Sequence, residues 1–390
     1  MKKIYLILIA ATLIFSSNFT KAEEPEFLSI TKVTDNVYNL HLNVGVVVGK
    51  EYVVLIESGY GEYKDSNNKI LAAVKSITDK PIKYVINMHS HGDHSGGNNF
   101  FAERGATIIT QKNVIYSGEF ESKYPKSNLI SFEKSFELNL GNEVIEIEHM
   151  ISHTFDDGIV YLKNSNVLFV GENYKPNYLT YLGMFGLDSF NTWGEMALTK
   201  LDHNTIVVPA HGKTLRNKQE LMEYRATYKA WFDRIKHLYQ EGKTANEMST
   251  DQLALSFVNK LNLDNNPEHH SKFYQNSIDG LIRFEMDNSM KLTATQMQDY
   301  VGSYQLANKE DIQVEILAGR LVAKQKNSFI SWLKPIGQDK FESMTFYGEL
   351  ISFSRNKAGD ITAVKASFPK KTHYQDRLTG QWSKTDNPSS

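Results

Sequence analysis

The chain has no cysteine, and this absence restricts its chemistry. Its 390 residues include 12 histidines and 45 acidic residues. Disulfides, a thiol nucleophile, a lipid-modified N-terminal cysteine and any cysteine-ligated metal are therefore excluded. Neither a serine nucleophile elbow nor a phosphate-binding glycine loop of the P-loop type is recognisable. A metal site in this protein would have to be built from histidine, aspartate and glutamate.

The chain also has little net charge and no apolar run of the usual transmembrane length. The net charge is −2 and there is no long basic run, so no nucleic-acid partner is expected. An apolar run from Ile4 to Phe15 follows two lysines and is too short to span a bilayer comfortably. It predicts a signal peptide over residues 1–22, cut after Ala22, and a periplasmic or secreted protein without a stable membrane span. The alternative is an uncleaved anchor.

Strand and helix patterns alternate along the first part of the chain. VYNLHL, VGVVVG and YVVLIES are rich in β-branched residues, and SNNKILAAVKSIT carries apolar residues at helical spacing. Several runs are apolar on both faces, which favours a layered α/β domain over residues 28–245. A long periodic helix is expected from Asn217 to about Glu241, ended by Gly242. Further helical segments, residues 246–290, follow as an extension or linker.

The composition changes near residues 287–292. From there, short strands such as YVGSYQL, FISWLKP and DITAVKASF alternate with turn signals. Strands at this spacing predict a small antiparallel β-barrel or meander over residues 293–385.

Residues 87–100, NMHSHGDHSGGNNF, gather three histidines and an aspartate within six positions. His89 and His91 can aim two imidazoles at one ion, because alternate residues at a strand exit share a side. Asp93 and His94 can then reach a second ion. The glycines of this loop are expected to let it turn tightly and to leave the site open on one side for water and substrate.

One loop does not supply enough ligands for two ions. His153, in a polar turn between two strands, and His211, directly after the apolar strand TIVVPA, are the candidates for the missing imidazoles. Two ions about 3.5–4 Å apart need shared negative charge between them. Glu172, after the strand NVLFVG, is the best candidate for a bridging carboxylate.

The order H-x-H-x-D-H, SHT, strand-Gly-acid and PAHG resembles the metallo-β-lactamase-fold hydrolases, over about residues 28–245. The resemblance implies a four-layer αβ/βα sandwich with two metals at the edge where the sheets meet. It also implies that the first metal is held by His89, His91 and His153, and the second by Asp93, His94 and His211, with Asp93 doubling as proton acceptor. The C-terminal strands resemble the lipocalin-like β-domains of some exported hydrolases.

Two positions depart from the family pattern. Glu57 stands where an aspartate usually lies beneath the metal loop. Glu172 stands where many of these hydrolases carry aspartate and true lactamases carry cysteine or serine. A Glu-Asn pair at this point is similar to the alkyl-sulfatase branch, in which a glutamate bridges, but that branch usually replaces the histidine corresponding to His153 with an acid. Whether Glu172 bridges, binds one metal or supports the ligands stays open.

These features predict an exported hydrolase with two divalent ions, zinc, acting on a small ester, lactone, lactam or sulfate ester. Paired ions lower the pKa of a bound water, so that hydroxide exists near neutral pH. Glu172 favours ester-type substrates over β-lactams. Tyr174, Tyr178 and Tyr181 are candidates for lining an apolar pocket. Two alternatives are an iron-containing oxidoreductase on the same fold and a non-catalytic binding protein.

Overall fold

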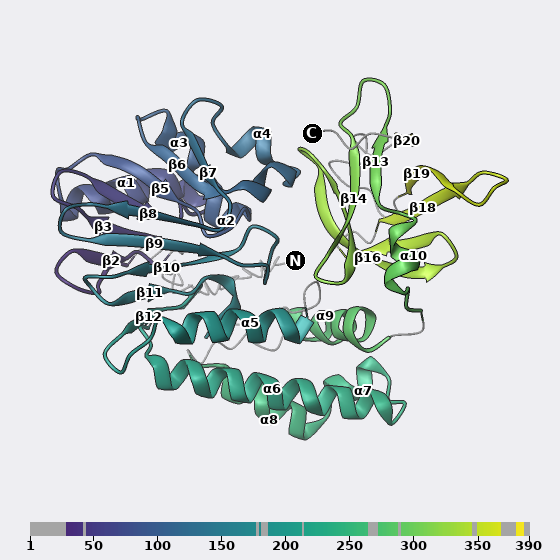
Figure 1. Cartoon of the computed structure of the whole chain (residues 1–390). Helices are drawn as coiled ribbons and strands as arrows, with labels where there is room; N and C mark the ends of the chain where they lie inside the picture. Colours follow the sequence, from purple (N-terminus) through teal and green to yellow (C-terminus); the bar gives the residue numbers. More distant parts are fainter. Residues whose placement is uncertain are drawn as a thin grey trace, which may run out of the picture.

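The computed structural model describes residues 29–41, 44–176, 179–180, 186–212, 214–263, 272–287, 290–344, 349–367 and 380–385. The predicted signal peptide lies outside these residues. Two open sheets and one barrel make up the β-structure of the described chain (Figure 1). Among the described residues, no helix is long and apolar enough to cross a membrane.

A seven-stranded sheet forms the first half of the sandwich. Its strands lie in chain order: β1 (Thr31–Lys32), β2 (Val37–Asn39), β3 (Gly45–Val48), β4 (Val53–Ile56), β5 (Ile82–Ile86), β6 (Thr107–Gln111) and β7 (Leu129–Phe132). The second half is a five-stranded sheet in the order β12 (Ile206–Val208), β11 (Val167–Phe169), β10 (Gly158–Leu162), β9 (Val144–His149) and β8 (Ser135–Asn139). Apolar side chains of the two sheets meet in a shared core, as sheets packed face to face do.

Helices cover the outer face of each sheet. On the first sheet lie α1 (Ser66–Ile77), α2 (Gly92–Ser95), α3 (Asn98–Ala102), η2 (Lys112–Tyr116) and α4 (Phe120–Lys123). Next to the second sheet lies α5 (Gly186–Thr199), and the core on this side also includes residues of α6 (Lys218–Gln240), α7 (Ala245–Ser249), α8 (Gln252–Leu261) and α9 (Lys272–Leu281), of which α6 to α8 lie beyond α5 (Figure 1). The remaining short helices are η1 (Tyr63–Asp65), η3 (Gly171–Asn173), η4 (Ile282–Met286) and α10 (Ala294–Gln298). The predicted four-layer αβ/βα sandwich is confirmed.

Helix α6 begins and ends where the sequence predicts. Asn217 accepts a hydrogen bond from the Glu220 backbone N–H at 3.0 Å, and Glu220 accepts one from the Asn217 N–H at 3.1 Å. Such a capping box satisfies two of the donors that a helix start leaves unpaired. The buried face of α6, which includes Tyr228, Trp231 and Ile235, packs into the core beneath the second sheet.

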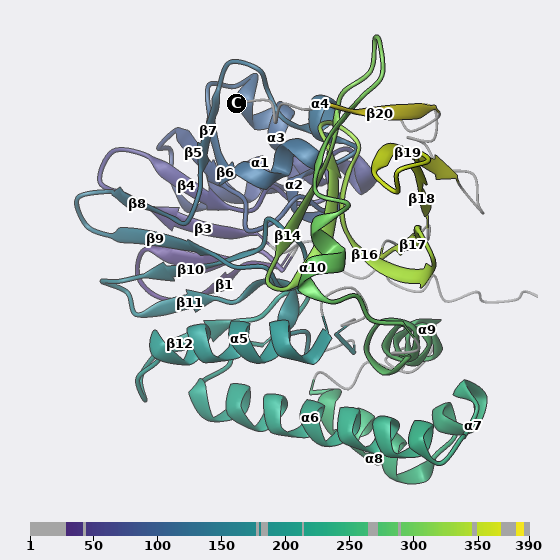
Figure 2. The same ribbon diagram turned by 45° about the vertical axis from the view of Figure 1, so that its right-hand side comes forward.

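The C-terminal strands close into an antiparallel barrel: β13 (Gly302–Gln305), β14 (Ile312–Leu317), β15 (Arg320–Gln325), β16 (Phe329–Gly337), β17 (Lys340–Ser343), β18 (Leu350–Arg355), β19 (Ile361–Ser367) and β20 (Gln381–Thr385). The pairing of β13 with β20 closes it, so the predicted barrel is confirmed over the alternative of an open meander. The domain limits at 28–245, 246–290 and 293–385 stay predictions. Figure 2 shows the barrel beside both the sandwich and the helices.

Candidate metal centre

The histidine-rich loop leaves the carboxyl end of β5 and enters α2, with His91 as the residue before the helix. The N–H groups of His94 and Ser95 donate to the His91 carbonyl at 3.0 and 2.9 Å. This tight turn is what the sequence predicts. It brings His89, His91, Asp93 and His94 to one end of the sheet.

The glycines of this loop have a different role from the one predicted. A Cβ on Gly96 would lie 2.5 Å from the Gly92 carbonyl oxygen and 2.8 Å from the Gly61 nitrogen. A Cβ on Gly97 would lie 2.4 Å from the Ser58 carbonyl oxygen. The prediction that these glycines leave room for substrate is therefore wrong for Gly96 and Gly97: they let two backbones approach each other.

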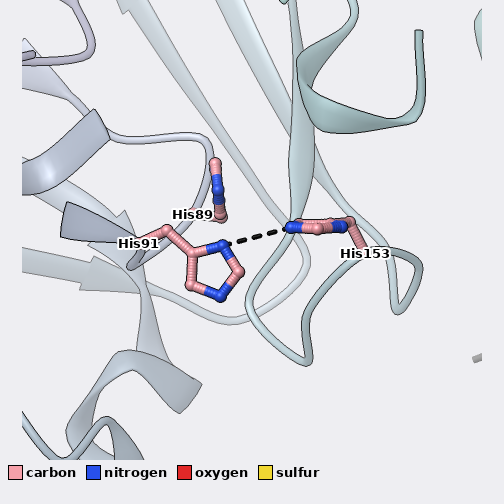
Figure 3. A group of neighbouring side chains, drawn as sticks. All are labelled: His89, His91 and His153. Carbon is pink, nitrogen blue, oxygen red and sulfur yellow. Dashed lines mark hydrogen bonds between the residues drawn. The ribbon is translucent and has the colours of Figure 1, made fainter. Parts of the chain in front are cut away.

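One group of candidate ligands consists of three histidines. Atoms of His89, His91 and His153 lie within 4.8 Å of one another, although His153 comes from the turn between β9 and β10. Figure 3 shows the three rings pointing toward a common centre. His153 Nε2 lies 3.1 Å from His91 Nδ1. The structure thus brings together the three residues predicted for the first metal.

The other group joins Asp93 and His94 to Glu172 and His211, again within 4.8 Å. Glu172 Oε1 lies 2.8 Å from His94 Nε2 and 2.7 Å from His211 Nε2. Asp93 Oδ2 lies 3.3 Å from the Nε2 atoms of both histidines. Glu172 and His211 follow β11 and β12, which are parallel neighbours, so their ends meet at the same edge.

Glu172 lies between the two groups. Its Oε1 faces the second group, while its Oε2 lies 4.0 Å from His153 Nε2. The Lys175 ammonium contacts the same Oε2. Burial by itself would raise the pKa of Glu172, but Lys175 and His211 hold it well below its usual range. The carboxylate is therefore ionised and reaches toward both groups.

The donor atoms suit divalent metal ions. Within the described residues, neither ring nitrogen of His89 has a hydrogen-bond partner although both are buried, which a metal ion would remedy. Burial lowers the pKa of His89, His91 and His153, and thus favours the neutral imidazole that binds metals. Four carboxylate and imidazole groups in the second cluster offer nitrogen and oxygen donors of the kind that zinc accepts.

A family model described as "Metallo-beta-lactamase superfamily" matches residues 38–211, the segment that carries every candidate ligand. Residues 38–211 thus carry the sequence pattern of this superfamily. The chain is 30% identical over 143 residues to a hydroxyacylglutathione hydrolase of Prochlorococcus marinus, a match that covers 35% of this chain and 53% of that protein. It is 27% identical over 168 residues to a type 2 metallo-beta-lactamase of Pseudomonas aeruginosa, covering 42% of this chain and 63% of that protein.

The chain thus spans about half to two thirds of the length of these two curated relatives. Among solved structures, it is similar to a stereoselective inverting sec-alkylsulfatase from Pseudomonas sp., with a TM-score of 0.50 and 15% identity. That match covers 68% of this chain and 52% of the other, and it supports the fold.

Glu57 lies behind two of the candidate ligands. It is fully buried, and its Oε1 lies 3.4 Å from His94 Nδ1 and 3.9 Å from His89 Nδ1. The same oxygen accepts a hydrogen bond from the Met88 N–H at 3.0 Å. Glu57 has a positive φ of 66°, an uncommon conformation that redirects its side chain. A carboxylate held behind two ligand rings fixes their orientation.

Replacing Glu57 with glutamine is expected to weaken zinc binding about 10- to 100-fold, because the side chain keeps its shape but loses the charge that orients the imidazoles. Competition with a chromophoric chelator measures this change. Glu143→Gln is the matched control: Glu143 is equally buried but accepts hydrogen bonds from the Asn164 and Ser165 N–H groups. Wild-type affinity in Glu57→Gln would show that the buried charge does not act on the ligands.

Sequence reasoning missed two residues of the site. Lys175 follows Glu172 by three positions, and only its side chain's contact with Glu172 reveals it. Asp157 accepts hydrogen bonds from the His153 N–H and the Asn173 amide, both at 3.0 Å, and so ties the His153 turn to η3. Burial raises the pKa of Asp157 to about 7. In the sequence, the acidic pair Asp156-Asp157 close after His153 was the pattern that could have indicated Asp157.

The predicted aromatic pocket is not supported at Tyr174. This residue is fully buried and packs on Tyr224, with ring centroids 4.7 Å apart. It belongs to the core under the second sheet and has no surface for a substrate. The other two candidates, Tyr178 and Tyr181, lie outside the described residues.

Proposed function

We propose that this protein is a two-zinc hydrolase of small esters, lactones, lactams or sulfate esters. The observation that carries the proposal is the pair of adjacent ligand groups with Glu172 between them. His89, His91 and His153 would hold one ion, and Asp93, His94 and His211 the other. When bound, such ions acidify a water molecule and polarise the bond to be cleaved.

Asp93 is the group best placed to take the proton of the attacking water. Its side chain is 30% exposed, whereas that of Glu172 is 3% exposed. Burial alone would raise the pKa of Asp93, but His94 and His211 hold it far below its usual range. The carboxylate is therefore ionised and can be reached by water; its low pKa makes it a weak base, so the support for this role is its position and exposure.

Lys175 favours substrates that carry negative charge. Its ammonium contacts Glu172 and its side chain is 16% exposed, so it places a positive charge next to the candidate ligands. A lysine there would attract an anionic group or stabilise charge that develops on the leaving oxygen. Among the proposed substrates, sulfate esters and carboxylate-bearing lactams fit this charge better than neutral esters do.

Replacing Lys175 with methionine is expected to lower kcat/KM for anionic substrates by about tenfold, because one charged contact is worth about 1.5 kcal/mol or more. Neutral aryl esters are expected to lose less than anionic substrates do, and their loss measures the effect of Lys175 on Glu172. Steady-state kinetics on one substrate of each charge gives the comparison. Lys112→Met, which removes an exposed lysine paired with Glu133, serves as the matched control. Equal losses on both substrate types would count against charge recognition by Lys175.

The test of the function combines metal analysis with an activity screen. Purified protein is analysed for metal, loaded with zinc, and assayed on aryl esters, lactones, chromogenic lactams and alkyl sulfates. We expect two zinc ions per chain and a hydrolysis that a chelator abolishes and zinc restores. Bound iron would favour an oxidoreductase instead, and failure to retain any metal would favour a binding protein.

We also propose that the protein is exported. The support is the order of two lysines, a short apolar run and small residues ending at Ala22, which is typical of a cleaved secretory signal.

A further inference from the structure

The barrel stands against the edge of the sandwich that carries the candidate metal centre. In Figure 1, strands β14 and β16 form the side of the barrel that faces the sandwich. The barrel is also fixed to the helical region, because Lys334 on β16 pairs with Asp287 at 2.8 Å and Arg283 contacts Glu342. Its position relative to the two sheets is thus set by several contacts.

One contact joins the barrel to the turn that carries His153. Trp332 on β16 packs on Phe155, with ring centroids 5.1 Å apart. Val322 and Met344 complete an apolar cluster that is distinct from the barrel's own core. All four side chains are at most 5% exposed. Phe155 is thus buried by residues of the barrel although it belongs to the sandwich.

The backbone and its hydrogen bonds connect Phe155 to His153, a candidate ligand. Phe155 lies two residues after His153, and its carbonyl accepts a hydrogen bond from the Asn113 amide at 2.9 Å. Asp157, two residues further on, accepts from the His153 N–H at 3.0 Å. A shift of the Phe155 ring would therefore be passed to the backbone that holds the His153 imidazole.

A second contact reaches the histidine-rich loop through α4. Asn327, in the turn between β15 and β16, donates its N–H to the Ile115 carbonyl at 2.7 Å and its side-chain amide to Glu121 at 3.0 Å. Also in α4, the Ser122 carbonyl accepts a hydrogen bond from the side-chain amide of Asn99, at the end of the histidine-rich stretch, at 2.5 Å. Helix α4 therefore contacts both the barrel turn, through Glu121, and the stretch that carries His91 and Asp93, through Asn99.

We propose that the β15–β16 hairpin of the barrel positions the metal ligands, with Trp332 and Asn327 as positioning residues. The inference rests on the proposed function, because it takes His91 and His153 to be ligands. Those two histidines belong to separate loops, and metal ligands bind well only when their supports hold them to within about 0.5 Å. The hairpin supports both loops from outside, one through Phe155 and the other through α4.

The experiment compares Trp332→Ala with wild type in the full-length protein. Hydrogen exchange of zinc-free protein measures the stability of residues 150–157, and chelator competition measures zinc affinity. We expect exchange of that turn to quicken and zinc affinity to fall, each about tenfold, because opening of the turn displaces His153. Trp332→Phe should restore both values. Ile336→Ala, an exposed position on the same strand, is the matched control.

Fast hydrogen exchange throughout β13–β20 would show that Trp332→Ala unfolds the barrel. The second variant, Asn327→Ala, is used in that case. Asn327→Ala removes only the side-chain contact to Glu121, and faster exchange over residues 112–124 with weaker zinc binding is then expected. Faster exchange with unchanged zinc affinity, or no change in either, overturns the positioning role. Failure of the wild type to bind zinc would instead overturn the proposed function, while the exchange data would still test the contact.

Discussion

Replacing His91 with alanine is expected to abolish both metal retention and hydrolysis. His91 lies 3.1 Å from His153 and belongs with His89 to the three-histidine group. A site reduced to two imidazoles holds zinc poorly, because such catalytic sites use three protein ligands. Bound metal supplies several kcal/mol to the transition state, so kcat/KM should fall by about 10³-fold or more.

Metal content after gel filtration and steady-state rates with zinc added measure the two effects of this substitution. His203→Ala is the matched control, because His203 is exposed, precedes β12 and is outside both ligand groups. The control should keep two metal ions and the wild-type rate. A His91→Ala protein that keeps both its metal content and its rate would show that the assignment of the site is wrong.

Shortening Glu172 to aspartate is expected to reduce the metal content from two ions toward one and to lower the rate by about 100-fold or more. Glu172 Oε1 lies 2.7 Å from His211, and Oε2 lies 4.0 Å from His153. A side chain one methylene shorter cannot keep both oxygens in these places. If the carboxylate bridges two ions, one of them therefore loses its shared ligand.

Metal stoichiometry distinguishes Glu172 as a metal ligand from Glu172 as a supporting residue. Loss of one ion indicates a bridge or a ligand of a single ion, whereas a small uniform loss of affinity indicates a supporting residue. Glu148→Asp is the matched control, since it shortens a half-buried glutamate paired with Lys200 at 2.5 Å. Unchanged stoichiometry and rate in Glu172→Asp would show that Glu172 is not a ligand.

Much of the fold could be predicted from local patterns. The strands β2, β3 and β4 coincide with β-branched runs, and α6 begins after Asn217 as its capping residues require. Such features depend on neighbours within a few residues, so they can be read from the chain directly. The closure of the barrel could not, because the pairing of β13 with β20 joins residues about 80 positions apart.

The candidate site, too, could be predicted from the sequence only in part. The chain by itself determined which donors are available, since a protein without cysteine and with H-x-H-x-D-H can offer a metal only nitrogen and oxygen. It also offered His153 and His211 as candidates from their places after or between strands, and the structure brings both close to the histidine-rich loop. The sequence could not predict that Tyr174 is a core residue. Nor could it predict that Lys175 contacts Glu172.

Tertiary structure alone decided how the loops meet. The parallel pairing of β11 with β12 brings Glu172 and His211 to one edge, and Gly96 and Gly97 are small because two backbones touch there. The contact of Trp332 with Phe155 joins the barrel to the His153 turn across 177 positions. The physical reason is common to all three: side-chain and backbone contacts between distant segments form only after the sheets have assembled, and no local pattern encodes them.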